Sequence, residues 1–166
     1  MIKQKVESAL NNQMNREFYS SYLYLSMAAY FESLNLKGLA HWMRIQSQEE
    51  YGHAMKFYGH LIERGGKVTL QPIETPPSKW ESPEKLFKDA YQHEQKVTKS
   101  INDLVELAKA EKDYPAELFL QWFVKEQVEE EANANEIVQK LHMIGKDGSA
   151  LLILDSQLGK RVPGKG

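Results

Sequence analysis

Glutamate side chains interrupt the apolar stripes of two stretches with helical spacing, at positions where a further core residue would be expected. Glu17 lies within the stripe that runs from Leu10 to Phe31, and Glu94 follows Ala90 by four residues in a second stripe. A buried carboxylate that stays ionised without a partner is strongly unfavourable. These positions therefore predict a chemical role for buried carboxylates in addition to packing.

Two further stretches carry pairs of polar residues at helical spacing. Glu50 and His53 are three residues apart, and so are Gln127 and Glu130, so each pair lies on one face of a helix. Counted from the expected helix starts, these positions and Glu17 and Glu94 all lie roughly 11 to 15 residues along. In a bundle of equally long helices, the four sets of side chains would meet near the midplane.

Metal binding is the chemistry that this set of residues predicts. Two divalent cations would balance the negative charges of four glutamates, namely Glu17, Glu50, Glu94 and Glu130. Oxygen ligands together with one imidazole suit iron or manganese, and they also admit zinc as a competitor. Because the sequence contains no cysteine, thiolate metal sites and disulfides are excluded.

Composition limits the classes of protein to which the chain can belong. Its 166 residues, 42% of them hydrophobic, predict a single globular domain over residues 1–166 with a sizeable core. The net charge of -2 is spread along the chain without a basic stripe, which argues against nucleic acid as a partner. No apolar run is long enough to span a membrane and the N-terminus lacks a signal-like apolar segment, so we expect no membrane association and a cytoplasmic location.

Apolar residues with helical periodicity predict four long helices and one short one. The expected ranges are residues 3–33, 38–64, 82–112, 115–144 and 150–158. Gly65 and Gly66 supply a stop for the second helix, and Ser82 with Pro83 supplies a start for the third. Pro115 is expected to open the fourth helix.

Connection lengths predict how these helices are arranged. The first and second helices, and the third and fourth, are joined by only a few residues and should be antiparallel neighbours. Between Gly66 and Glu81 the chain contains three prolines, and its roughly 16 residues could extend for about 50 Å, whereas each long helix measures about 40 Å. The sequence therefore predicts an all-α four-helix bundle with one long crossover and parallel second and third helices.

The motifs on these helices jointly resemble those of the ferritins, specifically the non-haem bacterial and archaeal type, and the resemblance covers essentially the whole chain. The motifs are Asn15-Arg16-Glu17, Glu49-Glu50-x-x-His53, His93-Glu94 and Glu126-Gln127-Val128-Glu129-Glu130. The resemblance implies a ferritin-like bundle and a function in iron storage and detoxification. It further implies a ferroxidase that oxidises Fe²⁺ with O₂ or H₂O₂ at a di-iron site and deposits the ferric mineral inside a protein cage.

The resemblance also implies which residues hold two irons per subunit. The first iron would take Glu17, Glu50 and His53. The second would take Glu50 as a bridge together with Glu94 and Glu130, with Gln127 close enough to assist.

Two positions depart from related metal-binding bundles. Gln127 stands where bacterioferritins and many di-iron oxidases carry a second Glu-x-x-His motif, so the second iron would lack a histidine. Gly52 stands where bacterioferritins have the methionine that ligates haem, so no haem is expected.

A third iron site is implied by the same resemblance at Glu49, Glu126 and Glu129. These three residues have a simpler explanation as solvated charges on helix surfaces. Tyr24 lies seven residues after Glu17 on the same stripe, so its hydroxyl is a candidate to bond a ligand carboxylate or to donate an electron. Core packing explains Tyr24 equally well.

The short helix expected over residues 150–158 contains four consecutive aliphatic residues, Leu151 to Leu154, and needs a partner surface. In the family that the chain resembles, this helix packs around the fourfold axes of a hollow twenty-four-subunit shell, and the resemblance implies the same homo-oligomer here. Two alternatives remain open at this point. They are a discrete di-iron oxidoreductase acting on a small organic substrate or peroxide, and a structural bundle that merely buries glutamates.

Overall fold

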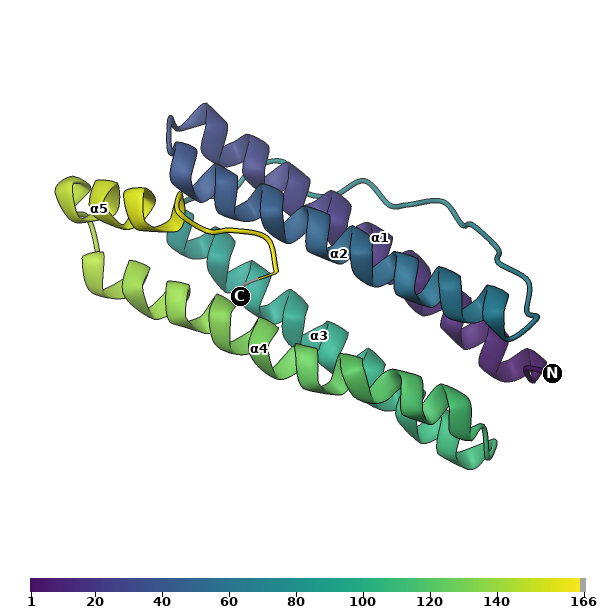
Figure 1. Ribbon diagram of the computed structural model, residues 1–166. Coiled ribbons are helices and arrows are strands. Elements are labelled where there is room, and N and C mark those ends of the chain that lie inside the picture. Colours follow the sequence, from purple (N-terminus) through teal and green to yellow (C-terminus); the bar gives the residue numbers. More distant parts are fainter. Residues whose placement is uncertain (165–166) are drawn as a thin grey trace.

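The computed structural model describes residues 1–164, which form five helices and, within that range, no strand. In chain order the helices are α1 (Gln4–Ser33), α2 (Lys37–Glu63), α3 (Pro83–Ala110), α4 (Tyr114–Ile144) and α5 (Gly148–Leu158). The four long helices lie side by side as a bundle, and α5 lies at the end where α2 begins (Figure 1). Among the described residues, no helix is both long and apolar enough to cross a membrane.

The connection between α2 and α3 runs along the whole bundle, so that α2 and α3 are parallel (Figure 1). Asn11 of α1 fixes this connection, because its Nδ2 donates to the Lys67 carbonyl at 2.9 Å and its Oδ1 accepts from the Thr69 amide at 2.7 Å. Further along, the Trp80 ring packs against Tyr30 with 5.6 Å between centroids. The predicted bundle with one long crossover is confirmed.

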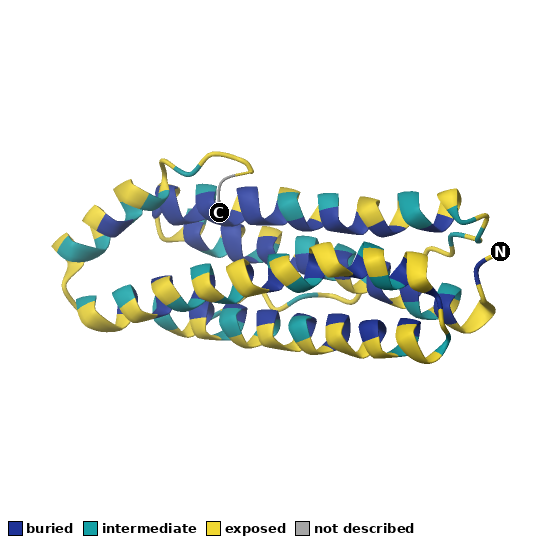
Figure 2. Ribbon diagram, turned by 60° about the horizontal axis from the view of Figure 1, so that its bottom comes forward, coloured by how far each residue is buried: buried dark blue, intermediate teal, exposed yellow. Residues whose placement is uncertain are grey.

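The core consists of two apolar clusters at opposite ends of the bundle. One includes Phe31, Phe87 and Leu141 together with Leu154 of α5, and the other is centred on Phe57 with Leu10 and Phe123 among its members. On each long helix, buried polar residues lie between the parts that belong to the two clusters. We call these residues the polar layer: Gln13, Glu17, Ser20, Gln46, Ser47, Glu50, His53, Glu94, Gln127 and Glu130. Buried residues line the inner faces of all four helices (Figure 2).

Side-chain caps shift two helix starts from their predicted positions. The Asp113 carboxylate accepts from the Ala116 amide at 3.1 Å, so α4 begins at Tyr114, one residue before Pro115. The Asp147 carboxylate accepts from the Ser149 amide at 2.9 Å, so α5 begins at Gly148 and not at residue 150.

The ends of α2 and α3 also differ from the prediction. The helix α2 ends at Glu63 because Gly65 turns the backbone to a φ of 67°. The helix α3 ends at Ala110 and not at residue 112, because Lys112 has a φ of 54°, which breaks the helical path.

The short helix α5 is fastened to the first turn of α2. The Asp155 carboxylate accepts a 2.8 Å hydrogen bond from the Leu39 amide, which belongs to the helix start that lacks an internal acceptor. Beside it, Gly38 allows close approach of the two backbones, since a Cβ there would lie 1.7 Å from the Asp155 carbonyl oxygen. This contact places α5 beside the first turn of α2.

Candidate metal centre

Side chains from all four long helices converge in the polar layer. The predicted carboxylates and imidazole are all buried there: Glu17, Glu50, His53, Glu94 and Glu130. Their potential ligand atoms form two sets in which all atoms lie within 4.8 Å of one another, Glu17 with Glu50 and His53, and Glu50 with Glu94 and Glu130. Glu50 belongs to both sets, so the geometry suits two cations that share one carboxylate.

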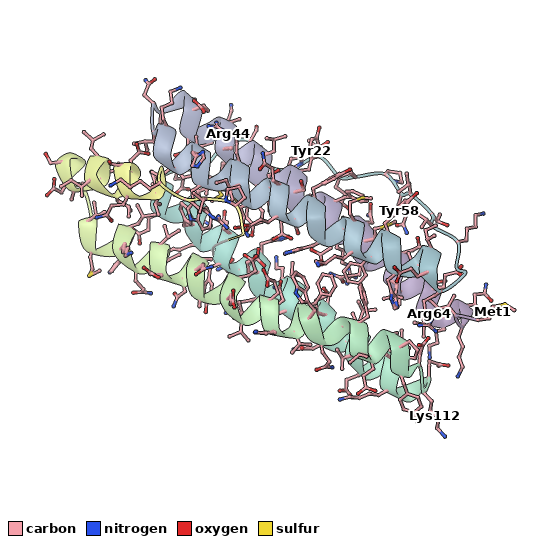
Figure 3. The ribbon with its side chains drawn as sticks, viewed as in Figure 1. Met1, Tyr22, Arg44, Tyr58, Arg64 and Lys112 are labelled. Carbon is pink, nitrogen blue, oxygen red and sulfur yellow. The ribbon has the colours of Figure 1, made fainter. Side chains whose placement is uncertain are left out.

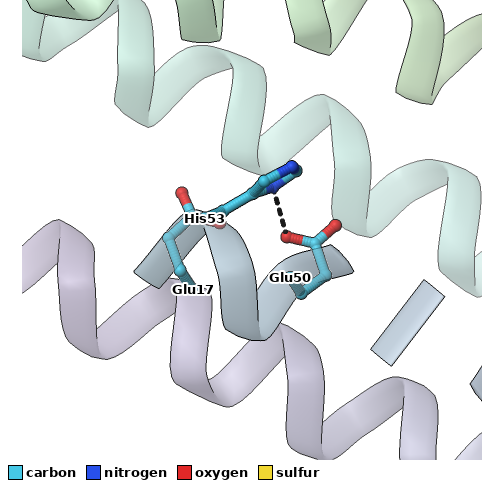
Figure 4. Close-up of side chains that lie close together, drawn as sticks. All are labelled: Glu17, Glu50 and His53. Carbon is cyan, nitrogen blue, oxygen red and sulfur yellow. Dashed lines mark hydrogen bonds and ion pairs between the residues drawn. The ribbon is translucent and has the colours of Figure 1, made fainter. Parts of the chain in front are cut away.

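His53 lies one helical turn after Glu50, with its Nδ1 3.0 Å from Glu50 Oε2 (Figure 4). The imidazole packs edge-on against the Trp122 ring, with 5.3 Å between centroids, and also against Phe123. Burial lowers the pKa of His53 to about 4, so the ring is neutral at pH 7. A neutral imidazole has the free lone pair that a metal ligand needs.

The glutamates of the polar layer resist ionisation in the absence of a cation. Burial raises the pKa of Glu17 to about 7. Burial, followed by repulsion from Glu94 and Glu130, raises the pKa of Glu50 well above its usual range. Burial also raises the pKa of Glu94 and, strongly, that of Glu130. Divalent cations would supply the opposite charge that these carboxylates lack.

Glutamine amides hold the carboxylates in place. Gln13 donates to Glu17 at 2.8 Å, and Gln46 donates to Glu50 at 3.3 Å. Gln46 also donates to Glu130 of α4, which ties α2 to α4 across the layer. Each such bond fixes one carboxylate oxygen, as partners of metal ligands commonly do.

Gln127 and Tyr24 both contact Glu94. Gln127 Nε2 donates to Glu94 Oε2 at 3.1 Å, and the buried Tyr24 hydroxyl donates to the other Glu94 oxygen. Burial, with the nearby charge of Glu94, raises the pKa of Tyr24 well above its usual range, so the phenol stays protonated as a donor. The structure thus places both predicted residues in contact with one carboxylate of the site.

The three residues predicted for a third site are placed differently from one another. Glu126 joins His53 and Glu130 in a further set of potential ligand atoms within 4.8 Å. Within residues 1–164, neither Glu49 nor Glu129 joins such a set. Both line a cavity of about 320 Å³ that Glu126 and Arg161 also line. Glu49 pairs there with Arg161, at 2.7 Å from Nη2 to Oε2.

The family model of the ferritin-like domain matches residues 7–144. The chain belongs to the ferritin family. Among its relatives, a bacterial non-heme ferritin of Bacteroides fragilis is 45% identical over 161 residues, which cover 97% of this chain and 100% of the relative. A bacterial non-heme ferritin of Escherichia coli O6:H1 is 38% identical, covering 95% of this chain and 96% of the relative.

Solved ferritin structures agree in fold along almost the whole chain. The open-pore ferritin of the hyperthermophilic archaeon Archaeoglobus fulgidus superposes with a TM-score of 0.97 at 55% identity, covering 98% of this chain and 100% of that one. A humanized archaeal ferritin superposes with a TM-score of 0.98 at 54% identity, covering 99% and 100%. The resemblance inferred from the motifs is therefore confirmed, and iron storage is the function of this family.

Sequence reasoning missed several residues that shape the centre of this ferritin. Gln13 and Gln46 each lie four residues before a glutamate of the site, a spacing that places them on the same helix face and could have identified them. Arg161 lies after the last helix, 112 residues from Glu49, and no local pattern links the two.

Proposed function

We propose that this ferritin oxidises Fe²⁺ at a paired site in the polar layer. One iron would bind Glu17, Glu50 and His53, and the other would bind Glu50, Glu94 and Glu130. The observation that carries the proposal is that Glu50 belongs to both compact sets of ligand atoms. A shared carboxylate keeps two irons adjacent, so that both can deliver electrons to one oxidant molecule.

The proposed reaction balances with either oxidant. With O₂, each of two Fe²⁺ ions loses one electron, and the oxygen molecule takes both electrons with two protons to give H₂O₂. With H₂O₂, the two electrons and two protons give two water molecules. Hard anionic carboxylates stabilise Fe³⁺ more than Fe²⁺, so the ligand set favours oxidation. Zn²⁺ and Mn²⁺ suit the same donors and act as competitors.

The two iron positions differ in their donors, and this difference supports release of the product. The position at Glu17 includes the His53 imidazole, whereas the position at Glu94 and Glu130 offers carboxylates and the Gln127 amide. The second iron should be held less firmly and should leave first. Glu126, whose ligand atom groups with those of His53 and Glu130, supports a path into the cavity, where Glu126, Glu129 and Glu49 would hold a third iron.

Oligomer formation is supported by the surface around α5. Leu152 and Ile153 of α5 and Met143 of α4 are exposed, with 62–78% of their surface accessible in the single chain. Apolar side chains grouped in this way favour burial against other subunits. We expect the twenty-four-subunit cage of the family, with α5 near its fourfold axes and the ferric mineral inside.

One experiment tests the proposed function. The protein is loaded aerobically with Fe²⁺, passed over a size-exclusion column, and assayed for iron and protein in each fraction. Storage predicts a large particle that carries many irons per chain. Two irons per chain in a small oligomer would instead indicate a discrete di-iron oxidoreductase, and a protein without iron would indicate a structural bundle.

A further inference from the structure

The segment after α5, Gly159–Gly164, folds back over α2 toward the middle of the bundle (Figure 1). Arg161 anchors this segment, which we call the tail. Its guanidinium lies 4.3 Å above the Trp42 ring, and its Nη1 donates to the Trp42 carbonyl at 3.2 Å. The Arg161 carbonyl oxygen lies 2.8 Å from His41 Nε2. Only 7% of the Arg161 side chain is exposed, so the residue is packed into the protein beside the site.

Both oxygens of the Glu49 carboxylate are bound by the tail. Arg161 Nη2 donates to Oε2 at 2.7 Å, and the Gly164 amide donates to Oε1 at 3.1 Å. A carboxylate whose two oxygens already accept from a charged donor and an amide offers a metal ion less negative charge and fewer free lone pairs than an unpaired carboxylate does. The tail therefore weakens Glu49 as a metal ligand.

The guanidinium also places a positive charge beside the acidic cavity. Glu49, Glu126, Glu129 and Glu130 line this cavity together with Arg161 and Lys56. Lys56 lies 4.3 Å above the Trp122 ring. Burial lowers the pKa of Arg161 while Glu49 and Glu130 oppose that shift, and arginine remains charged throughout the physiological range. A metal ion entering the cavity thus meets a fixed cation already paired with Glu49.

We propose that Arg161 is a tethered cation that competes with a metal ion for Glu49, so that a metal ion bound in the cavity weakens the hold of Arg161 and loosens the tail. The identity of the metal as iron rests on the proposed function, whereas the competition itself applies to any divalent cation. Without this competition the cavity would hold a metal ion more tightly. Arg161 therefore keeps the third position weak, and iron that leaves the paired site is not trapped beside it.

The test is a calorimetric titration of the assembled full-length protein with Zn²⁺, which binds the same donors without redox chemistry. In Arg161→Gln, the affinity of the cavity for Zn²⁺ should rise about tenfold or more, while the two sites of the polar layer keep their affinity. Lys160→Gln removes the same charge from an exposed neighbour in the tail and should change nothing. Glu129→Gln assigns the third binding event to the cavity by weakening it.

Two further variants isolate the role of Glu49. Adding Glu49→Gln to Arg161→Gln should abolish the increase in Zn²⁺ affinity, because the carboxylate that the arginine releases is then absent. Arg161→Lys keeps the charge and should resemble the parent protein. If Arg161→Gln fails to assemble, truncation after Gly159 removes the guanidinium together with the tail. This truncation should give the same increase in the affinity of the cavity for Zn²⁺.

Amide hydrogen exchange provides a second readout, which a purely structural role of Arg161 would not affect. Saturating Zn²⁺ should increase exchange at residues 160–164 of the parent protein, because the metal displaces the tail. The proposal would be overturned if Arg161→Gln left the affinity of the cavity for Zn²⁺ unchanged or lower. It would also be overturned if Zn²⁺ filled the cavity while amide exchange at residues 160–164 stayed slow. If the parent protein bound no Zn²⁺ tightly in the polar layer, that result would instead contradict the paired site itself.

Discussion

The Tyr24 hydroxyl of α1 donates a hydrogen bond to the Glu94 carboxylate of α3, and both groups are buried. The bond joins two helices that are separated by the long crossover, at the level of the polar layer. Glu94 also accepts from Gln127 of α4, so both of its oxygens are oriented by neighbours. Tyr24 is therefore assigned a positioning role for a proposed ligand of the second iron.

Replacing Tyr24 with phenylalanine should slow Fe²⁺ oxidation several-fold, because Glu94 is then oriented by Gln127 alone. It should also lower the free energy of unfolding by about 1–2 kcal/mol, since a buried carboxylate oxygen loses its donor. Stopped-flow absorbance of the ferric product and thermal unfolding measure the two effects. Tyr22→Phe is the matched control on the exposed side of the same helix (Figure 3). Equal effects of both variants would refute the positioning role.

Replacing His53 with alanine should reduce the initial rate of Fe²⁺ oxidation by about a hundredfold or more, because changes to mere partners of metal ligands already reduce activity by about 10- to 100-fold. His60→Ala on the same helix removes an imidazole that stacks on Phe119 outside the site, and it should retain activity. An unmodified rate in His53→Ala would contradict the proposed paired site.

Replacing Glu50 with glutamine should raise the thermal stability of the metal-free protein and lower the rate of Fe²⁺ oxidation. The change removes a carboxylate that Glu94 and Glu130 repel, so the metal-free protein should resist thermal unfolding better at pH 8. The same change removes the shared ligand, so Fe²⁺ oxidation should fall by about a hundredfold or more. A variant that is less stable without metal would show that the carboxylates do not repel one another as proposed.

The stability of the metal-free protein should depend on pH through Glu17. Because burial raises its pKa from 4.5 to about 7, the folded state binds more protons than the unfolded state between these values. The contribution of Glu17 to stability is fully present below pH 4.5 and is lost as the pH rises to 7. Thermal unfolding across this window should show a shallower pH dependence in Glu17→Gln. An identical dependence in both proteins would contradict the raised pKa.

Metal binding should show the opposite pH dependence, because the carboxylates must release protons to bind a cation. The affinity of the polar layer for Zn²⁺ should increase as the pH rises toward 7. Calorimetric titrations in buffers with different ionisation enthalpies would count the protons released. Affinity that is independent of pH would contradict the proposed ligand set.

Replacing Gly38 with alanine should disturb α5, because the new Cβ would clash with the Asp155 carbonyl. We expect a loss of about 1–3 kcal/mol in the free energy of unfolding and a shift to smaller oligomers on size exclusion. Gly59→Ala on the same helix meets no atom within 4 Å and should stabilise the protein by up to about 1 kcal/mol. Retention of the full assembly by Gly38→Ala would refute the role of this contact.

Local patterns along the chain were sufficient to predict the bundle and most of the centre. Helical periodicity depends on neighbours a few residues apart, and the length of the segment between Gly66 and Glu81 permitted a crossover that reaches the far end of α2. Carboxylates such as Glu17 could be identified from the sequence because an unpaired charge within an apolar stripe is energetically unfavourable. The caps at Asp113 and Asp147 place the starts of α4 and α5 before the predicted residues 115 and 150.

Contacts between helices depended on packing that no local pattern encodes. Gln46 reaches Glu130, 84 residues away, only because α2 and α4 have a particular rotation and axial offset. Arg161 reaches Glu49 because α5 packs closely against α2 at Gly38, and the tail that follows α5 lies over α2. Periodicity specifies which face of a helix is buried, but rotation and offset arise from the fit of all side chains at once.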